Sequence, residues 1–471
     1  MRNLEPARTA MRAVTIHVLA LLFAGCGGAQ PSSPQRSAEI QASASPLLQS
    51  AACAAALAAH TGPDLEDAAV EKAQRLVLRA QAAAAQLEQL GWAYVAKGRA
   101  SFDPGYFKLA EQTALCIDSL QPHGLPEPLE SRLLRAHVLH QLHHFAAAEQ
   151  LARGLVAERG YWFDYAILGD ALMEQGKLRE AVGAYQQMID QKPGPQSFVR
   201  AAQLRWLTGD LSGAIDLMRS AARATNRRDA DTAAWTQTRL ATMLAESGAT
   251  NEALTRFRYA LSMAPRYAPA MLGEGRLLLA GGAVANAVGI LREAARLNPL
   301  PEYQWALIEA LDASGADASE VRSELAARGA SEDPRSYSVF LASTGGDARL
   351  AMRLADEELK IRQDVFTFDA AAWAALAAGD LARARQFSRS SLLEGTNDAR
   401  LLYHASIIAA RSGDTRAARK LTRRLATLEQ MLLPSERAQL RNQSAGQVPQ
   451  APTRVAAQLR RSGFLKPSTG D

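Results

Sequence analysis

The sequence predicts an all-α protein, a right-handed superhelical solenoid of antiparallel helix pairs with about ten repeats. Three observations lead to this prediction. An amphipathic helix–turn–helix pattern recurs at a regular period along most of the 471 residues. Most copies have a glycine at the turn and an alanine five positions later. The composition is 48% hydrophobic but only 6% aromatic because alanine, the best helix former, dominates it.

The clearest copy of the pattern lies between Trp162 and Gly194. Gly176 ends its first helix, because glycine adopts the left-handed conformation at a helix C-terminus at the least cost. Gly169 lets the two helices approach closely, and the second helix stops before Pro193, which cannot continue it. The residues predicted to face the partner helix are Tyr165, Leu168 and Leu172 in the first helix and Ala181, Tyr185 and Met188 in the second.

The turn glycine and its alanine recur downstream at regular intervals. The pairs are Gly209/Ala214, Gly248/Ala253, Gly282/Ala287, Gly346/Ala351, Gly379/Ala384 and Gly413/Ala418. Successive alanines from Ala181 are therefore close to one period apart, except that two periods separate Ala287 from Ala351. This longer interval holds a short unit around Val321, and upstream His143 takes the place of the turn glycine. We count about ten repeats between Ala84 and Met431.

These residues resemble the tetratricopeptide repeat (TPR), whose pattern of large, Leu, Gly and large residues, then Gly, Ala, aromatic, small and Pro, has a period of about 34 residues. The resemblance covers about three quarters of the chain. It implies a solenoid in which each repeat packs only on its neighbours, so that no single large core is needed. It also implies that positions 2, 5, 9 and 12 of each first helix line a concave groove.

Aromatic residues are concentrated at these groove positions. The first helices are expected to begin at Ala84, Leu129, Trp162, Pro195, Ala234, Ala268, Glu302, Glu332, Val365 and Ala399. Nine of the forty groove positions are then aromatic, against 6% of the chain: Trp92, Phe163, Trp206, Trp235, Tyr303, Phe340, Phe366, Trp373 and Tyr403. Aromatic anchors are typical of protein recognition, so these nine residues are the predicted partner-binding groove. The alternative is that some of them pack between helices as core.

Residues 1–26 are predicted to be a lipoprotein signal peptide. Three arginines precede an apolar run from Ala13 to Ala24, which is too short to span a bilayer as a stable helix. The run leads into Leu22-Phe23-Ala24-Gly25-Cys26, which resembles a bacterial lipobox. The resemblance implies that Cys26 is lipidated and becomes the mature N-terminus, and Gly27 after it favours the outer membrane. The alternative is plain secretion with cleavage after Ala29.

The rest of the chain divides by composition and periodicity. Residues 27–46 are rich in Ser, Pro, Gln and Gly and are predicted to be a flexible tether. Residues 47–83 are predicted to form two N-terminal helices, and residues 84–433 the TPR solenoid. The pattern decays after about Pro434, so residues 434–471 are predicted to be a C-terminal capping helix and a disordered tail. No transmembrane span is expected.

Two cysteines remain after Cys26. Cys53 and Cys116 could pair in an oxidising periplasm, where the bond would close a long loop. The favoured interpretation is that they are two buried free thiols, because Cys116 lies near inward-facing positions of a predicted second helix.

Catalytic and metal-binding patterns are scarce. The sequence has no G-x-x-x-x-G-K-[ST], G-x-S-x-G, H-E-x-x-H or C-x-x-C motif. Four histidines cluster at His137, His140, His143 and His144, and His140 and His144 could share a helical face for a metal. No carboxylate or thiolate stands close by, so we interpret all four as partly exposed polar residues on a first helix and its turn. We expect no enzyme and no cofactor; a metal-binding or enzymatic protein using this cluster is the weaker alternative.

These patterns predict a non-catalytic protein–protein interaction scaffold, lipid-anchored in the bacterial cell envelope at the outer membrane and facing the periplasm. Similar TPR lipoproteins serve in the assembly of outer-membrane export machines and pili. The resemblance therefore implies envelope proteins as partners, with an adaptor role in exopolysaccharide export as the alternative. The net charge is only +5, and basic residues are scattered among acidic ones, so neither a nucleic acid nor a small-molecule substrate is expected.

Overall fold

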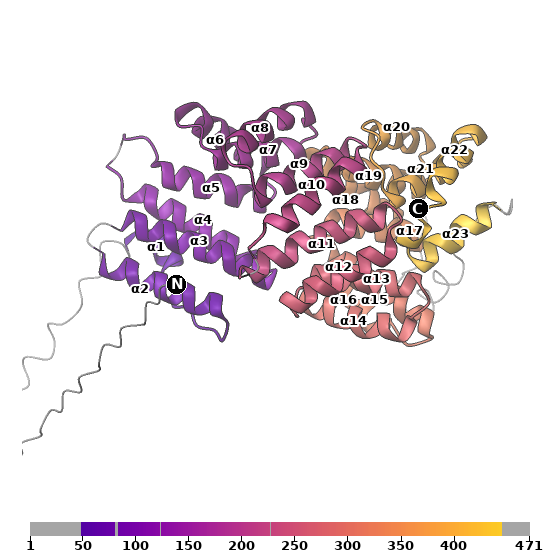
Figure 1. The fold of residues 1–471 in the computed structure, drawn as a ribbon, viewed down its shortest axis with the longest axis horizontal. Helices are drawn as coiled ribbons and strands as arrows, with labels where there is room; N and C mark the ends of the chain where they lie inside the picture. Colours follow the sequence, from indigo (N-terminus) through magenta and orange to yellow (C-terminus); the bar gives the residue numbers. More distant parts are fainter. Residues whose placement is uncertain (1–48, 81–82, 123, 227, 445–471) are drawn as a thin grey trace, which may run out of the picture. The chain divides into compact units, whose positions relative to one another are not determined.

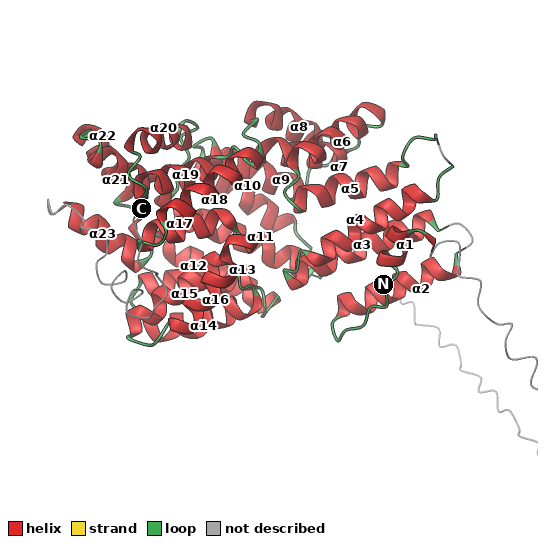
Figure 2. Ribbon diagram, turned by 180° about the vertical axis from the view of Figure 1, so that it is seen from behind, coloured by secondary structure: helices red, strands yellow, loops and turns green. Residues whose placement is uncertain are grey.

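A computed structural model of the chain describes residues 49–80, 83–122, 124–226 and 228–444. The predicted signal peptide with Cys26, the tether and the predicted tail after residue 444 lie outside these residues. Figure 2 shows helices joined by loops throughout the described part of the chain. In that part, no helix combines the length and the apolar character needed to cross a membrane.

Ten successive antiparallel helix pairs form the solenoid in the described residues (Figure 1), as the sequence predicts. The pairs are α3 (Ala84–Ser101) and α4 (Gly105–Ser119), α5 (Leu129–Gln141) and α6 (Phe145–Glu158), α7 (Trp162–Glu174) and α8 (Leu178–Gln191), α9 (Pro195–Leu207) and α10 (Leu211–Ala224), α11 (Ala230–Glu246) and α12 (Thr250–Met263), α13 (Ala268–Ala280) and α14 (Val284–Leu297), α15 (Pro301–Ser314) and α16 (Ser319–Glu332), α17 (Pro334–Thr344) and α18 (Ala348–Ile361), α19 (Val365–Ala377) and α20 (Leu381–Leu392), and α21 (Ala399–Arg411) and α22 (Thr415–Leu425). Helices α1 (Ala51–Ala56) and α2 (Leu65–Arg79) precede them, and the short 3-10 helix η2 (Glu429–Met431) and α23 (Pro434–Ser444) follow.

The turn residues set the register of the repeats. Gly176 has a φ of 71°, and the same left-handed conformation recurs at Gly209, Gly248, Gly282, Gly379 and Gly413. Between α17 and α18 the predicted turn glycine Gly346 does not adopt it, because Gly345 takes that place with a φ of 71°. His143 adopts it as well, with a φ of 65°, as its place in the repeat requires. Seven of the ten first helices begin at the predicted residue. The other three begin at Ala230, Pro301 and Pro334 in place of Ala234, Glu302 and Glu332.

The two helices of a pair meet through small residues. Six of the alanines that follow the turns are fully buried, namely Ala181, Ala214, Ala253, Ala287, Ala351 and Ala384, whereas Ala418 in the last repeat is half-buried. Gly169 faces the Tyr185 ring, and a Cβ added there would lie 2.3 Å from Tyr185 Cε1. Because protein interiors are closely packed, such contacts fix the distance between the helices of a repeat.

The expectation that repeats contact only their neighbours is wrong. The Trp206 indole at the end of α9 donates a hydrogen bond to the Asn397 carbonyl at 3.0 Å. Thr396 in the same loop donates to the Leu207 carbonyl at 2.6 Å. Nearer the N-terminus, the Gln363 amide before α19 donates to the Glu174 carbonyl at 3.1 Å. The loops before α19 and α21 thus pack against the ends of first helices several repeats earlier.

The chain stays folded beyond the last repeat, after Pro434, where the repeat pattern was expected to decay. Residues 434–444 form α23, and Leu432, Leu433 and Leu440 at and before this helix are buried. Their burial adds this segment to the hydrophobic core around Trp305 and Trp373. The repeat pattern ends here, but the folded structure continues.

The two remaining cysteines form a disulfide between α1 and α4, so the expectation of two free thiols is wrong. Their Cα atoms are 4.7 Å apart because α1 packs directly against α4. The sequence correctly placed Cys116 at a buried position of a second helix. It did not show that α1 would bring Cys53 to the same place.

Candidate partner-binding groove

The first three repeats place an aromatic cluster at groove positions. Trp92 on α3 and His137 on α5 are both at position 9, and Phe163 on α7 is at position 2. The ring centroids are 5.3 Å apart for Trp92 and His137 and 5.8 Å apart for Trp92 and Phe163. Trp92 and Phe163 are half-buried, so part of each ring faces solvent. We call these three residues together with Arg99 the N-terminal patch.

Charged groups adjoin the N-terminal patch. Nη2 of Arg99, which is exposed, donates to His137 Nε2 at 2.9 Å. Burial and the positive charge of Arg99 hold the pKa of His137 well below its usual value, so the imidazole is neutral and accepts this bond. Beside it, Arg200 binds both oxygens of Asp170 at 2.8 Å. The patch therefore presents the rings of Trp92 and Phe163 and the guanidinium of Arg99 to a ligand. The charges of Arg200 and Asp170 beside it neutralise each other.

Three predicted groove residues lie near the middle of the solenoid. Trp206 is buried by the loop before α21, and its ring lies 5.8 Å from that of Phe366 on α19. Phe366 and Trp235 are half-buried and pack against the same hydrophobic core. Side chains from both sides thus meet across the groove here, where an open surface was expected.

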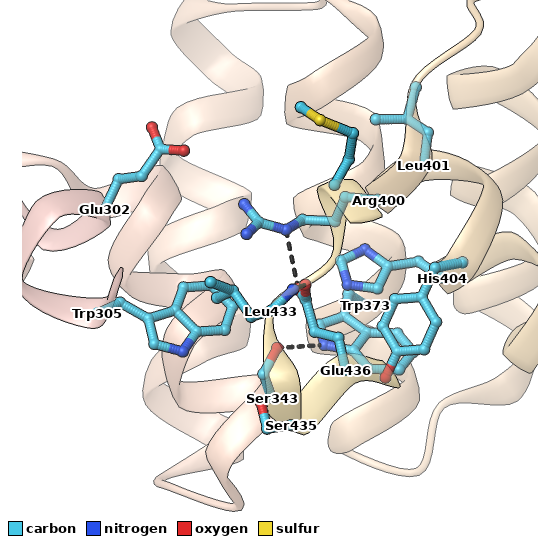
Figure 3. Close-up of polar contacts among 12 residues, drawn as sticks. Glu302, Trp305, Ser343, Trp373, Arg400, Leu401, His404, Leu433, Ser435 and Glu436 are labelled. Atoms are coloured by element: carbon cyan, nitrogen blue, oxygen red, sulfur yellow. Dashed lines mark hydrogen bonds and ion pairs between the residues drawn. The ribbon is translucent and has the colours of Figure 1, made fainter. Parts of the chain in front are cut away.

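The four predicted groove residues of the later repeats are Tyr303, Phe340, Trp373 and Tyr403. Trp373 donates to Ser343 Oγ at 2.9 Å and stacks on His404 with centroids 4.1 Å apart (Figure 3). Phe340 is half-buried against Trp305. Trp206, Tyr303, Trp373 and Tyr403 are only 1–7% exposed. The prediction that these four side chains line an accessible groove is therefore wrong. They pack in the core, which was the alternative interpretation of the sequence.

Two groove residues were missed because α15 begins one residue earlier than predicted. With Pro301 as its first residue, Trp305 takes position 5 and Glu309 position 9, while Tyr303 moves off the groove positions. The signal was present in the sequence, since Gly315 follows Pro301 at the same spacing as Gly176 follows Trp162. His404 was also missed; its Nδ1 donates to Asp369 Oδ2 at 2.7 Å inside the core.

The histidine cluster is spread over different surroundings. His137 belongs to the N-terminal patch and is buried, not partly exposed as expected. His143 stacks on Phe145, and burial together with Arg362 lowers its pKa to about 3. Burial also lowers the pKa of His140, whose Nε2 has no hydrogen-bond partner among the described residues. Those residues contain no group of three or more His, Cys, Asp and Glu side chains placed to hold a metal.

A pocket of about 740 Å³ lies outside the groove, between α10, α11 and α12. Arg219, Arg223, Arg256 and Tyr259 line it. Glu252 partly neutralises this basic lining, with oxygens 3.1 Å from Arg219 and 3.6 Å from Arg256. The residues that line the pocket include no acid–base or nucleophile pair.

Two family models described as tetratricopeptide repeat match the chain, at residues 168–229 and 244–311. The chain is a TPR protein. Comparison with curated protein sequences gives no significant match.

Among solved structures, this TPR protein is similar in fold to the human IFIT1 dimer with m7Gppp-AAAA. The identity is 13%, the TM-score is 0.43, and the match covers 76% of this chain and 85% of that chain. For the human IFIT1 dimer with PPP-AAAA, the identity is 12%, the TM-score is 0.44, and the coverage is 78% and 95%. The groove of the TPR protein must therefore be interpreted from its own residues.

Proposed function

We propose that this TPR protein is a non-catalytic interaction scaffold, held by a lipid on Cys26 at the periplasmic face of the bacterial outer membrane. Its partners are envelope proteins, and its role is in the assembly of envelope or secretion machinery. TPR solenoids bind other proteins through the groove of their first helices. The two TPR matches therefore support the role as a protein-interaction scaffold.

The observation that carries the scaffold role is the N-terminal patch. Its two rings remain partly exposed at groove positions, while Trp373 and Tyr403 in the later repeats are covered by the chain itself. Trp, Tyr and Arg are enriched among the few residues that supply most of the binding energy at protein interfaces. The patch is therefore the part of the groove where we place a partner protein.

The disulfide supports the proposed compartment. Bonds such as that between Cys53 and Cys116 persist in oxidising surroundings, including the bacterial periplasm, and are rare in the cytosol. Two or more acyl chains on Cys26 would give stable membrane attachment, which a single chain does not.

Partner retention tests the scaffold role. Full-length protein is immobilised, and envelope proteins are captured from a detergent extract and quantified by mass spectrometry. Truncating a true anchor costs about 2 kcal/mol in binding, so Trp92→Ala with Phe163→Ala should lower retention of specific partners at least 10-fold. Tyr161→Ala is the matched control, because Tyr161 is an exposed aromatic residue outside the groove positions. Equal retention by both variants would refute the proposed site.

Fractionation tests the anchor. The Cys26→Ser variant should appear in the soluble fraction or remain unprocessed, whereas the wild-type protein should sediment with outer membranes. A processed Cys26→Ser protein that still sediments with membranes would show that the lipid is not the anchor.

A further inference from the structure

The segment from Leu428 to Leu440 lies against the groove positions of three first helices, as Figure 3 shows for part of it. We call it the C-terminal segment. It comprises η2, the turn at Leu432 and Leu433, and the first two turns of α23. It contacts α13, α15 and α21, and the first two of these helices lie several repeats earlier in the chain.

Four groove residues bind the C-terminal segment through polar contacts. Arg276 donates to the Met431 carbonyl at 2.8 Å, and Arg400 donates to Glu436 at 2.9 Å. Glu309 accepts the Ser435 amide at 3.1 Å. Tyr403 donates to Gln439 at 2.7 Å. Arg276 and Glu309 are at position 9 of their helices, Arg400 is at position 2 and Tyr403 at position 5. Each contact thus comes from a position that the repeat assigns to ligand binding.

The buried side chains of the C-terminal segment lie in the turn before α23 and on one side of that helix. Leu432 and Leu433 are buried in the turn, and Glu436 and Leu440, four residues apart, are buried on the helix. The opposite side of α23 is open to solvent, with Ala438 and Arg441 exposed. A helix that lays one face into a groove through anchors about one turn apart is a common mode of peptide recognition.

The ion pair between Arg400 and Glu436 indicates that this part of the groove favours a negatively charged side chain in its ligand. Arg400 lies over the Trp305 ring, with its guanidinium carbon 4.8 Å from the centroid, and its Nε donates to Glu436. Burial opposes ionisation of Glu436, but Arg400 and the Leu433 amide outweigh it, and the pKa of Glu436 is lowered. The groove is thus matched to a helix with one acidic side chain among leucines.

We propose that the groove formed by α13, α15 and α21 is a docking surface for an amphipathic helix of a partner protein, and that the C-terminal segment covers it as a displaceable ligand of the same chemistry. The partner presents two adjacent leucines just before its helix, an acidic residue in the first turn of the helix and another leucine one turn beyond. This inference rests on the proposed scaffold function. The surface is distinct from the N-terminal patch, so the two sites can be tested separately.

Binding of a peptide in trans tests the proposal. A labelled peptide with the sequence of residues 428–442 is titrated with full-length protein, and its fluorescence anisotropy is recorded. Leu433→Ser with Glu436→Ala in the full chain weakens the covering segment, so this variant should bind the peptide at least 10-fold more tightly than the wild type. Adding Arg400→Glu should abolish binding, and a peptide with Glu436→Arg should restore it.

Hydrogen exchange on the wild-type protein provides the second measurement. Amides of α23 should exchange at least 10-fold faster than those of α21, because a displaceable segment opens while the repeat beneath stays folded. Exchange of α23 and α21 at the same rate would make the segment an integral part of the core and overturn the proposal. A weakened variant that stays folded and does not bind the peptide would also overturn it. Neither result bears on Trp92 and Phe163, whose variants test the scaffold function.

Discussion

Trp92 and Trp373 occupy position 9 of their repeats, yet their surroundings differ. Trp92 is half-buried beside two other rings, whereas Trp373 is 3% exposed between Ser343 and His404. The position in the repeat predicts which way a side chain points. It does not predict whether another part of the chain will cover it, because that depends on contacts between distant repeats.

Trp373→Ala should therefore act as a core substitution. Truncating a buried aromatic residue typically costs about 3–5 kcal/mol, and Phe257→Ala, within the packing of α11 and α12, should cost a similar amount. Trp92→Ala should cost less, since part of its ring stays in solvent. Urea unfolding followed by circular dichroism compares the three. A Trp373→Ala protein as stable as the Trp92→Ala protein would contradict this assignment.

The carboxylate of Asp67 should make the N-terminal helices sensitive to acid. Burial alone would raise its pKa, but hydrogen bonds from Lys97, the Asp64 amide and His60 outweigh burial and lower the pKa to about 2. A carboxylate with a lowered pKa stabilises the folded state above the unfolded pKa of 3.8. That stabilisation, about 2 kcal/mol, is lost as the pH falls from about 4 to about 2.

Asp67→Asn measures this contribution. Hydrogen exchange in α2 and α3 should be faster in the variant than in the wild type at pH 6, and the difference should vanish near pH 2. Glu71→Gln on the exposed side of α2 is the control and should leave exchange unchanged. A difference between wild type and Asp67→Asn that persists near pH 2 would show that the lowered pKa is not its cause.

At the scale of helices, most of the architecture is readable from the sequence. The turn residue and the alanine five positions later place helix pairs because each has a local cause: a left-handed turn and a close helix contact. The same offset would have placed α15 correctly had Gly315 been used as its turn. Helix α23 could not be predicted in this way, since it lacks the repeat pattern and is ordered by residues far away in the sequence.

The disulfide links the first and fourth helices and should stabilise that end of the chain. In the chain-entropy model, closing a loop over a separation of 63 residues is worth about 4 kcal/mol. Replacing Cys53 and Cys116 by Ser should therefore raise hydrogen exchange throughout α1–α4. Exchange in α14 should be unchanged, because its main packing partners are α13 and α15. An equal rise in both regions would show that the bond stabilises the whole chain.

At the scale of the whole described chain, contacts between distant repeats add to the contacts between neighbours. Asn397 donates to the Glu246 carbonyl at 3.4 Å, and the Ala399 amide donates to the Glu246 carboxylate at 3.2 Å. Burial raises the pKa of Glu246 well above its usual value, with the negative charge of nearby Asp398 adding to the effect. Contacts of this kind have no signature in a repeat pattern, which encodes only local spacing.

Unfolding should reflect these contacts. A solenoid with neighbour contacts alone unfolds through partial states. Here α9, α11 and α21 should instead lose exchange protection at the same urea concentration, because the loop before α21 joins them. Thr396→Ala and Asn397→Ala, combined with Trp206→Phe to remove the indole donor, should separate their transitions. Ser390→Ala, whose hydroxyl bonds within α20 itself, should not. Separate transitions already in the wild type would refute this coupling.

The contacts of Thr396, Asn397 and the C-terminal segment can form only late in the synthesis of the chain. A chain is synthesised from its N-terminus, and its repeats can fold as they emerge. Helices α9, α11, α13 and α15 are complete long before residues 396–440 exist. During that interval their inner faces have no cover, and any protein present can reach them. In the finished molecule, residues 396–440 cover these faces.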